Sequence, residues 1–336
     1  MKTLVLASFL LGAWTANEYL FEPKPEHEQT IVRTFRFESE MANEPSGDDE
    51  MGGDFEMEMS SAFTCVVADK MGEVEDGTLQ SMTREFRELE SSMRQSWSAP
   101  EMEPEEMEVE LASDLQGHTV LFAKGEDPAW AEGDSADDDL LLGLTESMAL
   151  LEFLPEGVTK VGDTWSLEPS TLLALEEPGG DLKLTPSDGM PSEEMGPDEG
   201  EEPEEELSGS IDATLESVEE DEGRRLATIQ LEVDIESFVD LTEFYAEMYG
   251  GGGEEEPEEG FIIPDVESAD STTSRAGKGQ VIWDLDAGRL VSLVLELDVE
   301  SIETTVMSFD TGQGVEEFEQ ENVMVGTESY EVNFDA

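Results

Sequence analysis

The chain has very few of the residues that carry most protein chemistry. Of its 336 residues, one is cysteine and two are histidine, so it can form no internal disulfide and no thiolate zinc site. His27 and His118 lack the spacing of a zinc protease, and no phosphate-binding glycine loop, dinucleotide fingerprint or Gly-x-Ser-x-Gly motif occurs. Paired carboxylates are so frequent that they carry no glycosidase signal. We expect a protein that is not an enzyme and needs no cofactor.

Basic side chains are also scarce. The chain has 86 acidic and 16 basic side chains, a net charge of −70. A surface of this charge repels other polyanions, which excludes nucleic acid as a partner. We interpret the acidity as an adaptation to a saline, halophilic setting, with part of the charge in disordered loops.

Long hydrophobic runs are missing beyond the N-terminus. Lys2 and the short apolar run that ends at Trp14 are typical of a signal peptide, which predicts cleavage near residue 16. No later stretch is long enough for a membrane span. The sequence therefore predicts a secreted or periplasmic protein, with one domain over residues 17–336.

What the chain does have is alternation of apolar and polar residues, best seen in residues 280–307. Two alternating runs flank the turn at 286–289, which is typical of a β-hairpin. Residues 226–238 match residues 290–302 in character at an offset of 64, so we interpret the hairpin as a reused unit. These patterns predict a mainly β fold (β-rich α+β), a curved antiparallel sheet or half-barrel of hairpins with a few short helices on its concave side.

Several local features complete this prediction. Residues 107–111 and 120–122 are predicted to form one hairpin, and residues 83–93 a strand passing into a helix. Helices are predicted over 140–154, capped by Asp137, and over 170–176 and 241–249. Disordered acidic inserts are expected at about 42–54, 178–207 and 250–260.

The apolar stripe of the hairpins is the candidate ligand-binding face. Its residues are Trp283, Leu285, Leu293, Leu295 and Leu297, together with Ile229, Leu231 and Val233. In one hypothesis the protein is a non-catalytic exported binding module for an apolar or lipid-like small molecule. In the other it is a structural or cell-envelope protein whose acidic surface holds water and cations such as calcium. The sequence identifies no protein partner.

Acidic clusters at 48–50, at 134–139 and at Asp284 and Asp286 could supply oxygen ligands to calcium. None has the spacing of an EF-hand loop, and solvated charge with a helix cap at Asp137 is the favoured interpretation. We therefore predict no metal site.

Three short segments carry a family resemblance. They are LPEGVTKVGDTW at 154–165, GQVIWDLDAGRL at 279–290 and the turn at 74–82. These segments resemble a family of exported bacterial proteins of unknown function that is common in planctomycete-type bacteria. More distantly, the layout resembles the half-barrel lipoprotein-carrier (LolA/LppX-like) superfamily. The resemblance implies a curved half-barrel, and it transfers no functional residue.

Overall fold

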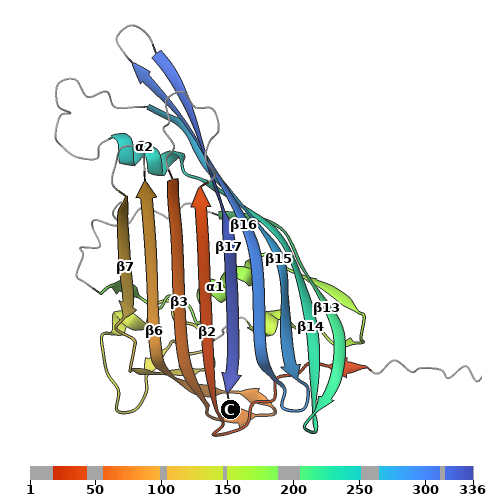
Figure 1. The fold of residues 1–336 in the computed structure, drawn as a ribbon. Helices are drawn as coiled ribbons and strands as arrows, with labels where there is room; N and C mark the ends of the chain where they lie inside the picture. Colours follow the sequence, from red (N-terminus) through yellow and green to blue (C-terminus); the bar gives the residue numbers. More distant parts are fainter. Residues whose placement is uncertain are drawn as a thin grey trace, which may run out of the picture.

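The computed structural model describes residues 18–43, 56–98, 104–146, 150–187, 205–250, 265–310 and 315–335. Within these residues, one antiparallel sheet of 13 strands dominates and does not close into a barrel (Figure 1), which confirms the predicted fold class. Eleven strands follow one another across it in the order β11 (Thr164–Leu167), β13 (Glu205–Asp221), β14 (Arg224–Asp240), β15 (Asp265–Asp284), β16 (Arg289–Asp310), β17 (Val315–Asp335), β2 (Thr30–Asn43), β3 (Glu56–Met71), β6 (Ser81–Ser98), β7 (Glu105–Ser113) and β12 (Leu184–Pro186).

The smaller elements lie around this sheet. Two further strands, β8 (Thr119–Ala123) and β9 (Ala129–Trp130), extend it beside β6, and two strand pairs stand apart: β1 (Tyr19–Leu20) with β10 (Val158–Thr159), and β4 (Val74–Glu75) with β5 (Thr78–Leu79). The helical elements are η1 (Asp138–Leu141), η2 (Leu150–Phe153), α1 (Ser170–Glu176) and α2 (Thr242–Gly250). The two short α-helices confirm the predictions for 170–176 and 241–249.

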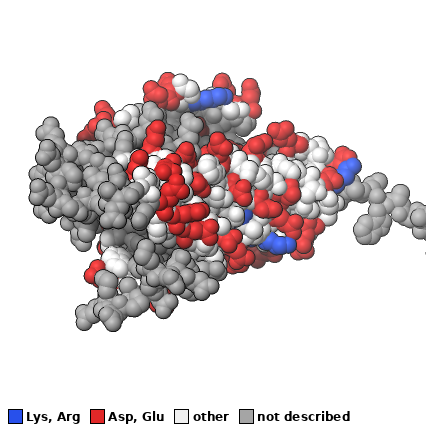
Figure 2. Space-filling model, turned by 90° about the horizontal axis from the view of Figure 1, so that it is seen from above, with Lys and Arg blue, Asp and Glu red and all other residues white. Residues whose placement is uncertain are grey.

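The reused hairpin unit has a clear place in the sheet. β14 and β16, which contain the two matching segments, both pair with β15, one on each side. From Ala227 to Ser237 in β14 and from Leu293 to Val299 in β16, every second residue is buried and the residues between them are exposed or half-buried. The acidic residues of these two stretches are among the exposed or half-buried residues and face outward, and Figure 2 shows carboxylates spread over the visible surface. Alternation with one buried face is the reason why these segments form strands.

Residues 83–93 do not pass into a helix, which corrects that prediction. They belong to β6, and both Phe86 and Leu89 are fully buried although they are three residues apart. The pairing of β6 with β3 shifts between Glu88 and Phe86, so Arg87 is the extra residue of a β-bulge. A bulge returns the next side chains to the same face and imitates helical spacing.

The helix predicted over 140–154 is also wrong, although its cap is right. Asp137 accepts a hydrogen bond from the backbone N–H of Asp139, but only the short 3-10 helices η1 and η2 form within the described residues of the segment. Gly143 takes a positive φ of 84°, and the backbone beside it pairs with Gly179, Gly180 and Asp181 instead of continuing the helix.

Two further corrections concern the sheet edge. β7 and β8 do not pair with each other, because β6 is long enough to pair with both along successive parts of its edge. The insert predicted over 178–207 is partly ordered: Leu182 is buried, β12 pairs with β7, and residues 205–207 begin β13. The rest of this insert, and most of those at 42–54 and 250–260, lie outside the described residues.

The concave face of the sheet is filled by the segment between β8 and β13 (Figure 1). Its apolar side chains and the inward side chains of the sheet form a single core cluster; the segment contributes Leu144, Leu150, Phe153, Leu172, Leu175 and Leu182. Cys65 also lies fully buried in this cluster, and burial raises the pKa of its thiol to about 12. The middle of the concave face is therefore packed core.

Candidate functional site

The eight residues predicted to bind a ligand lie together in the core. None of them exposes more than 5 % of its surface, and the covering segment packs in the same cluster. One of the eight, Trp283, also lines a pocket.

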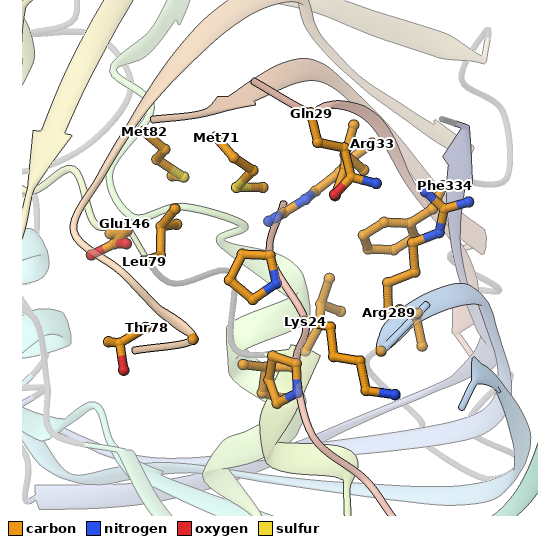
Figure 3. Close-up of a pocket in the computed structure, with 18 of the residues that line it drawn as sticks. Lys24, Gln29, Arg33, Met71, Thr78, Leu79, Met82, Glu146, Arg289 and Phe334 are labelled. Atoms are coloured by element: carbon orange, nitrogen blue, oxygen red, sulfur yellow. The ribbon is translucent and has the colours of Figure 1, made fainter. Parts of the chain in front are cut away.

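That pocket lies at one end of the sheet and has a volume of about 550 Å³ (Figure 3). It forms where β2 and β16 begin and where β3, β15 and β17 end. Most of its lining is apolar: Pro23, Pro25, Ile31, Met71, Leu79, Met82, Leu150, Leu151, Trp283, Leu290 and Phe334. Volumes of 300–1,000 Å³ with largely apolar walls are typical of small-molecule sites.

One wall of the pocket is an extended strap, residues 21–29, which runs from β1 to β2. At one end of the strap, the backbone N–H of Lys24 bonds to the carbonyl oxygen of Gly288 at 3.1 Å. At the other end, the N–H of Glu28 bonds to the carbonyl oxygen of Met71 at 3.0 Å. The strap thus connects the β15–β16 turn to the end of β3, and Pro23 and Pro25 stiffen it between these anchors.

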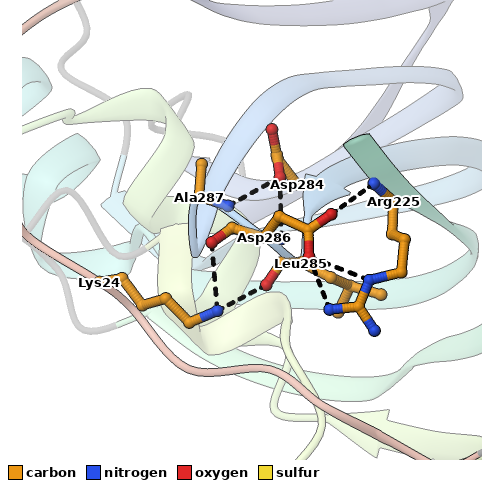
Figure 4. A network of polar contacts seen from close by, with 6 residues as sticks. All are labelled: Lys24, Arg225, Asp284, Leu285, Asp286 and Ala287. Carbon is orange, nitrogen blue, oxygen red and sulfur yellow. Dashed lines mark hydrogen bonds and ion pairs between the residues drawn. The ribbon is translucent and has the colours of Figure 1, made fainter. Parts of the chain in front are cut away.

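The β15–β16 turn is built to hold this strap (Figure 4). Lys24 Nζ donates to the carbonyl oxygens of Leu285 at 2.7 Å and Asp286 at 3.2 Å. Asp284 Oδ1 accepts from two N–H groups of the turn, and Arg225 donates to the Asp286 carboxylate. This hydrogen bond from Arg225 holds the pKa of Asp286 below its usual value. A Cβ on Gly288 would come within 2.5 Å of a strap carbonyl, so the close approach needs glycine.

A buried charge cluster lies next to the pocket. Arg84 and Asp69 are both fully buried, and Arg84 donates to both carboxylate oxygens, at 2.8 and 3.2 Å. Arg84 also donates to the carbonyl oxygens of Thr145 and Glu146, which holds this segment against the sheet. Arg33, which lines the pocket, reaches Asp69 at 3.2 Å. Burial raises the pKa of Asp69, but the charges of Arg33 and Arg84 outweigh it and bring the pKa below its usual value.

Arg289 is the other arginine on the pocket wall. Its side chain is half-buried beside Phe334, while Glu146 lies on the opposite side of the pocket (Figure 3). The structure describes nine arginines, and eight of them have a carboxylate within 4.0 Å. Arg289 has none among the described residues.

A second polar network ties α1 to the sheet away from the pocket. The hydroxyl of Tyr330 lies 2.9 Å from a Glu176 oxygen and 3.1 Å from a Glu328 oxygen, and Glu328 pairs with Arg275 at 3.1 Å. Burial raises the pKa of Glu176, against the opposing effects of Arg275 and the Tyr330 hydrogen bond. One phenol proton cannot bond to two carboxylates, so both contacts are hydrogen bonds only when one carboxyl is protonated.

The acidic clusters considered for calcium have other partners. Asp134 contacts His118 Nδ1 at 2.7 Å and accepts from the N–H of Thr119, while Asp284 and Asp286 belong to the turn described above. The cluster at 48–50 lies outside the described residues. Within the described part of the chain, no group of three or more His, Cys, Asp or Glu is placed to hold a metal ion. Also within that part, no helix is long and apolar enough to cross a membrane.

No protein-family model matches the chain, and no curated protein is significantly similar to it.

The pocket was not predicted, because its lining comes from five separate parts of the sequence: residues 23–33, 71–82, 146–151, 283–290 and Phe334. Two local signals pointed toward it. The Pro23–Pro25 pair marked an extended lead, and the Gly288–Arg289 pair marked a turn that introduces a cation at the start of an apolar strand. Neither signal says that the two segments meet.

Proposed function

We propose that this is an exported, non-catalytic binding protein that takes up one apolar or lipid-like small molecule in the pocket beside the strap. The observation that carries the proposal is the pocket itself, a space of about 550 Å³ with mostly apolar walls at one end of the sheet. Apolar walls stabilise a bound alkyl chain by about 0.8 kcal/mol per buried CH₂.

The size and the walls suit a single chain. At roughly 30 Å³ per water-sized group, the pocket has room for an alkyl chain of about ten to twelve carbons and a headgroup. Met71 and Met82 line it, and thioether side chains adapt to irregular apolar ligands. Export of the protein rests on the N-terminal sequence, which lies outside the described residues.

The first test is extraction and mass spectrometry of the mature protein purified from its native envelope, with titration of a fluorescent fatty acid. We expect an extracted amphiphile and saturable binding of about one probe per chain. A protein that yields no amphiphile and binds no probe would contradict the proposal. A structural role for the acidic surface would then be the better interpretation.

Two leucines provide a matched pair of variants. Leu151 lines the pocket and is 53 % exposed, while Leu142 is 62 % exposed and lies outside the pocket lining. Leu151→Gln removes part of an apolar contact, so we expect binding about threefold to tenfold weaker. Leu142→Gln should bind like the wild type. Equal affinities of the two variants would place the ligand elsewhere.

A further inference from the structure

The charge of Arg289 is unusual in this protein. The chain carries a net charge of −70, and carboxylates are available to pair with almost any cation. Arg289 is nevertheless half-buried on an apolar pocket wall, with no carboxylate within 4.0 Å among the described residues. The nearby acids of the turn, Asp284 and Asp286, bond to backbone N–H groups and to Arg225.

The buried charge cluster on the pocket wall adds a second positive charge. Arg33 and Arg84 share the single carboxylate of Asp69, so the cluster keeps one uncompensated positive charge. Arg33 also lies over the ring of Phe334, with its guanidinium carbon 5.5 Å from the ring centroid. In Figure 3, Arg289 lies beside Phe334, and the side chain of Arg33 extends from that side toward Met71 across the middle of the pocket.

The opposite side of the pocket has a different character. Met71, Leu79 and Met82 lie there in Figure 3, and the exposed Glu146 marks its outer part. The side at Arg289 is therefore cationic, and the opposite side is apolar except for Glu146. This polarity suits a molecule with a charged head and an apolar tail, and a neutral hydrocarbon would leave the arginine unpaired.

We propose that the ligand is a single-chain amphiphile with one anionic headgroup, a carboxylate bound by Arg289. The tail lies against Met71, Leu79 and Met82, and the charge of Arg33 favours the head. The proposal rests on the function proposed above and names the ligand class of the same pocket. A planar guanidinium can hold a carboxylate through two parallel hydrogen bonds, which a lysine cannot do.

The experiment compares three ten-carbon compounds that differ only in the headgroup: decanoate, decyl phosphate and decanol. Each displaces a neutral fluorescent probe from the mature protein at fixed salt and neutral pH. We expect decanoate to bind at least about tenfold tighter than decanol, because a hydrogen bond to a charged group contributes at least that factor. A phosphate preferred over the carboxylate would overturn the choice of a carboxylate.

Variants of Arg289 and Arg36 test whether Arg289 causes the preference for decanoate over decanol. In Arg289→Gln the preference for decanoate over decanol should disappear, while decanol binds as before. Arg289→Lys should restore part of the preference. The matched control is Arg36→Gln, which removes the same charge from a side chain that is 54 % exposed, pairs with Glu331 and does not line the pocket. It should retain the wild-type preference.

The outcomes separate the two proposals. If none of the three compounds displaces the probe, the proposed function itself fails. If decanol and decanoate bind equally to the wild type, or if Arg289→Gln keeps the preference, the pocket binds apolar molecules but the headgroup inference is wrong.

Discussion

The Asp69 carboxylate should be the single most important charge for stability among the described residues. It lies between two arginines, Arg84 at 2.8 Å and Arg33 at 3.2 Å, and both Asp69 and Arg84 are fully buried. Asp69→Ala leaves two cations without their anion at the edge of the core. Removing one partner of a buried pair costs about 3–5 kcal/mol, because the remaining charge stays desolvated.

Urea unfolding followed by tryptophan fluorescence measures this loss. For a chain of this size we take a slope of about 3 kcal/mol per molar urea, so the midpoint of Asp69→Ala should fall by about 1–1.7 M. Asp69→Asn keeps an acceptor for Arg84 and should lose less. The control is Glu106→Gln, which breaks a pair with Arg94 in which both side chains are more than half exposed. Its midpoint should not change measurably.

The pH dependence gives a second check on the same residue. The pKa of Asp69 is lower in the folded protein than its ordinary 3.8, so its contribution to stability is present above that value and is lost as the pH falls through the folded pKa. The difference between the wild type and Asp69→Asn should therefore shrink in strong acid. If Asp69→Ala and Glu106→Gln have equal midpoints at neutral pH, the reasoning on the buried cluster is refuted.

Two other measurements test the charges of this protein. The pKa of Glu176 is raised in the folded state, so its contribution to the free energy of unfolding is fully present below its ordinary pKa of 4.5 and is lost as the pH rises through the folded pKa. Glu176→Gln should remove this loss, so the variant should gain stability relative to the wild type at neutral pH. Identical profiles of stability against pH for the two proteins would contradict the assignment. The net charge of −70 should make folding salt-dependent, because salt screens the repulsion between the carboxylates. The thermal midpoint should therefore rise between about 0.05 M and about 2 M salt, where the Debye length falls from over 10 Å to under 3 Å. An unchanged midpoint would mean that the folded part of the chain carries little of the repulsion.

Much of the sheet could be predicted because a strand with one buried face shows a period of two. The two segments that match in sequence, 226–238 and 290–302, lie in the strands β14 and β16 as expected, and the residues predicted to face inward on them are buried. The prediction was wrong where the backbone departs from this period. The bulge at Arg87 placed Phe86 and Leu89 on one face, and single-sequence spacing cannot distinguish that from a helical turn.

The error over 140–154 has another cause. The segment is apolar on every side and has a good cap, which favours a helix on local grounds. Its backbone instead pairs at Leu144 with Gly180, and Arg84 binds the carbonyl oxygens of Thr145 and Glu146. Both partners are distant in the sequence, so the tertiary contacts that override the local preference could not be predicted from the segment alone.

The candidate site shows the same limit at a larger scale. Alternation indicates which side chains face inward, and it correctly grouped Trp283 with Leu293, Leu295 and the others in one stripe. It does not indicate which inward residues the covering segment reaches. The middle of the stripe is packed by that segment, whereas at the strand ends the strap spans the sheet and leaves a pocket. Trp283 is the next-to-last residue of β15, and among the eight predicted residues it is the one that lines this pocket. In a half-open sheet with a filled concave face, the space for a ligand therefore lies at the strand ends, and the turns and their charged residues determine what can enter it.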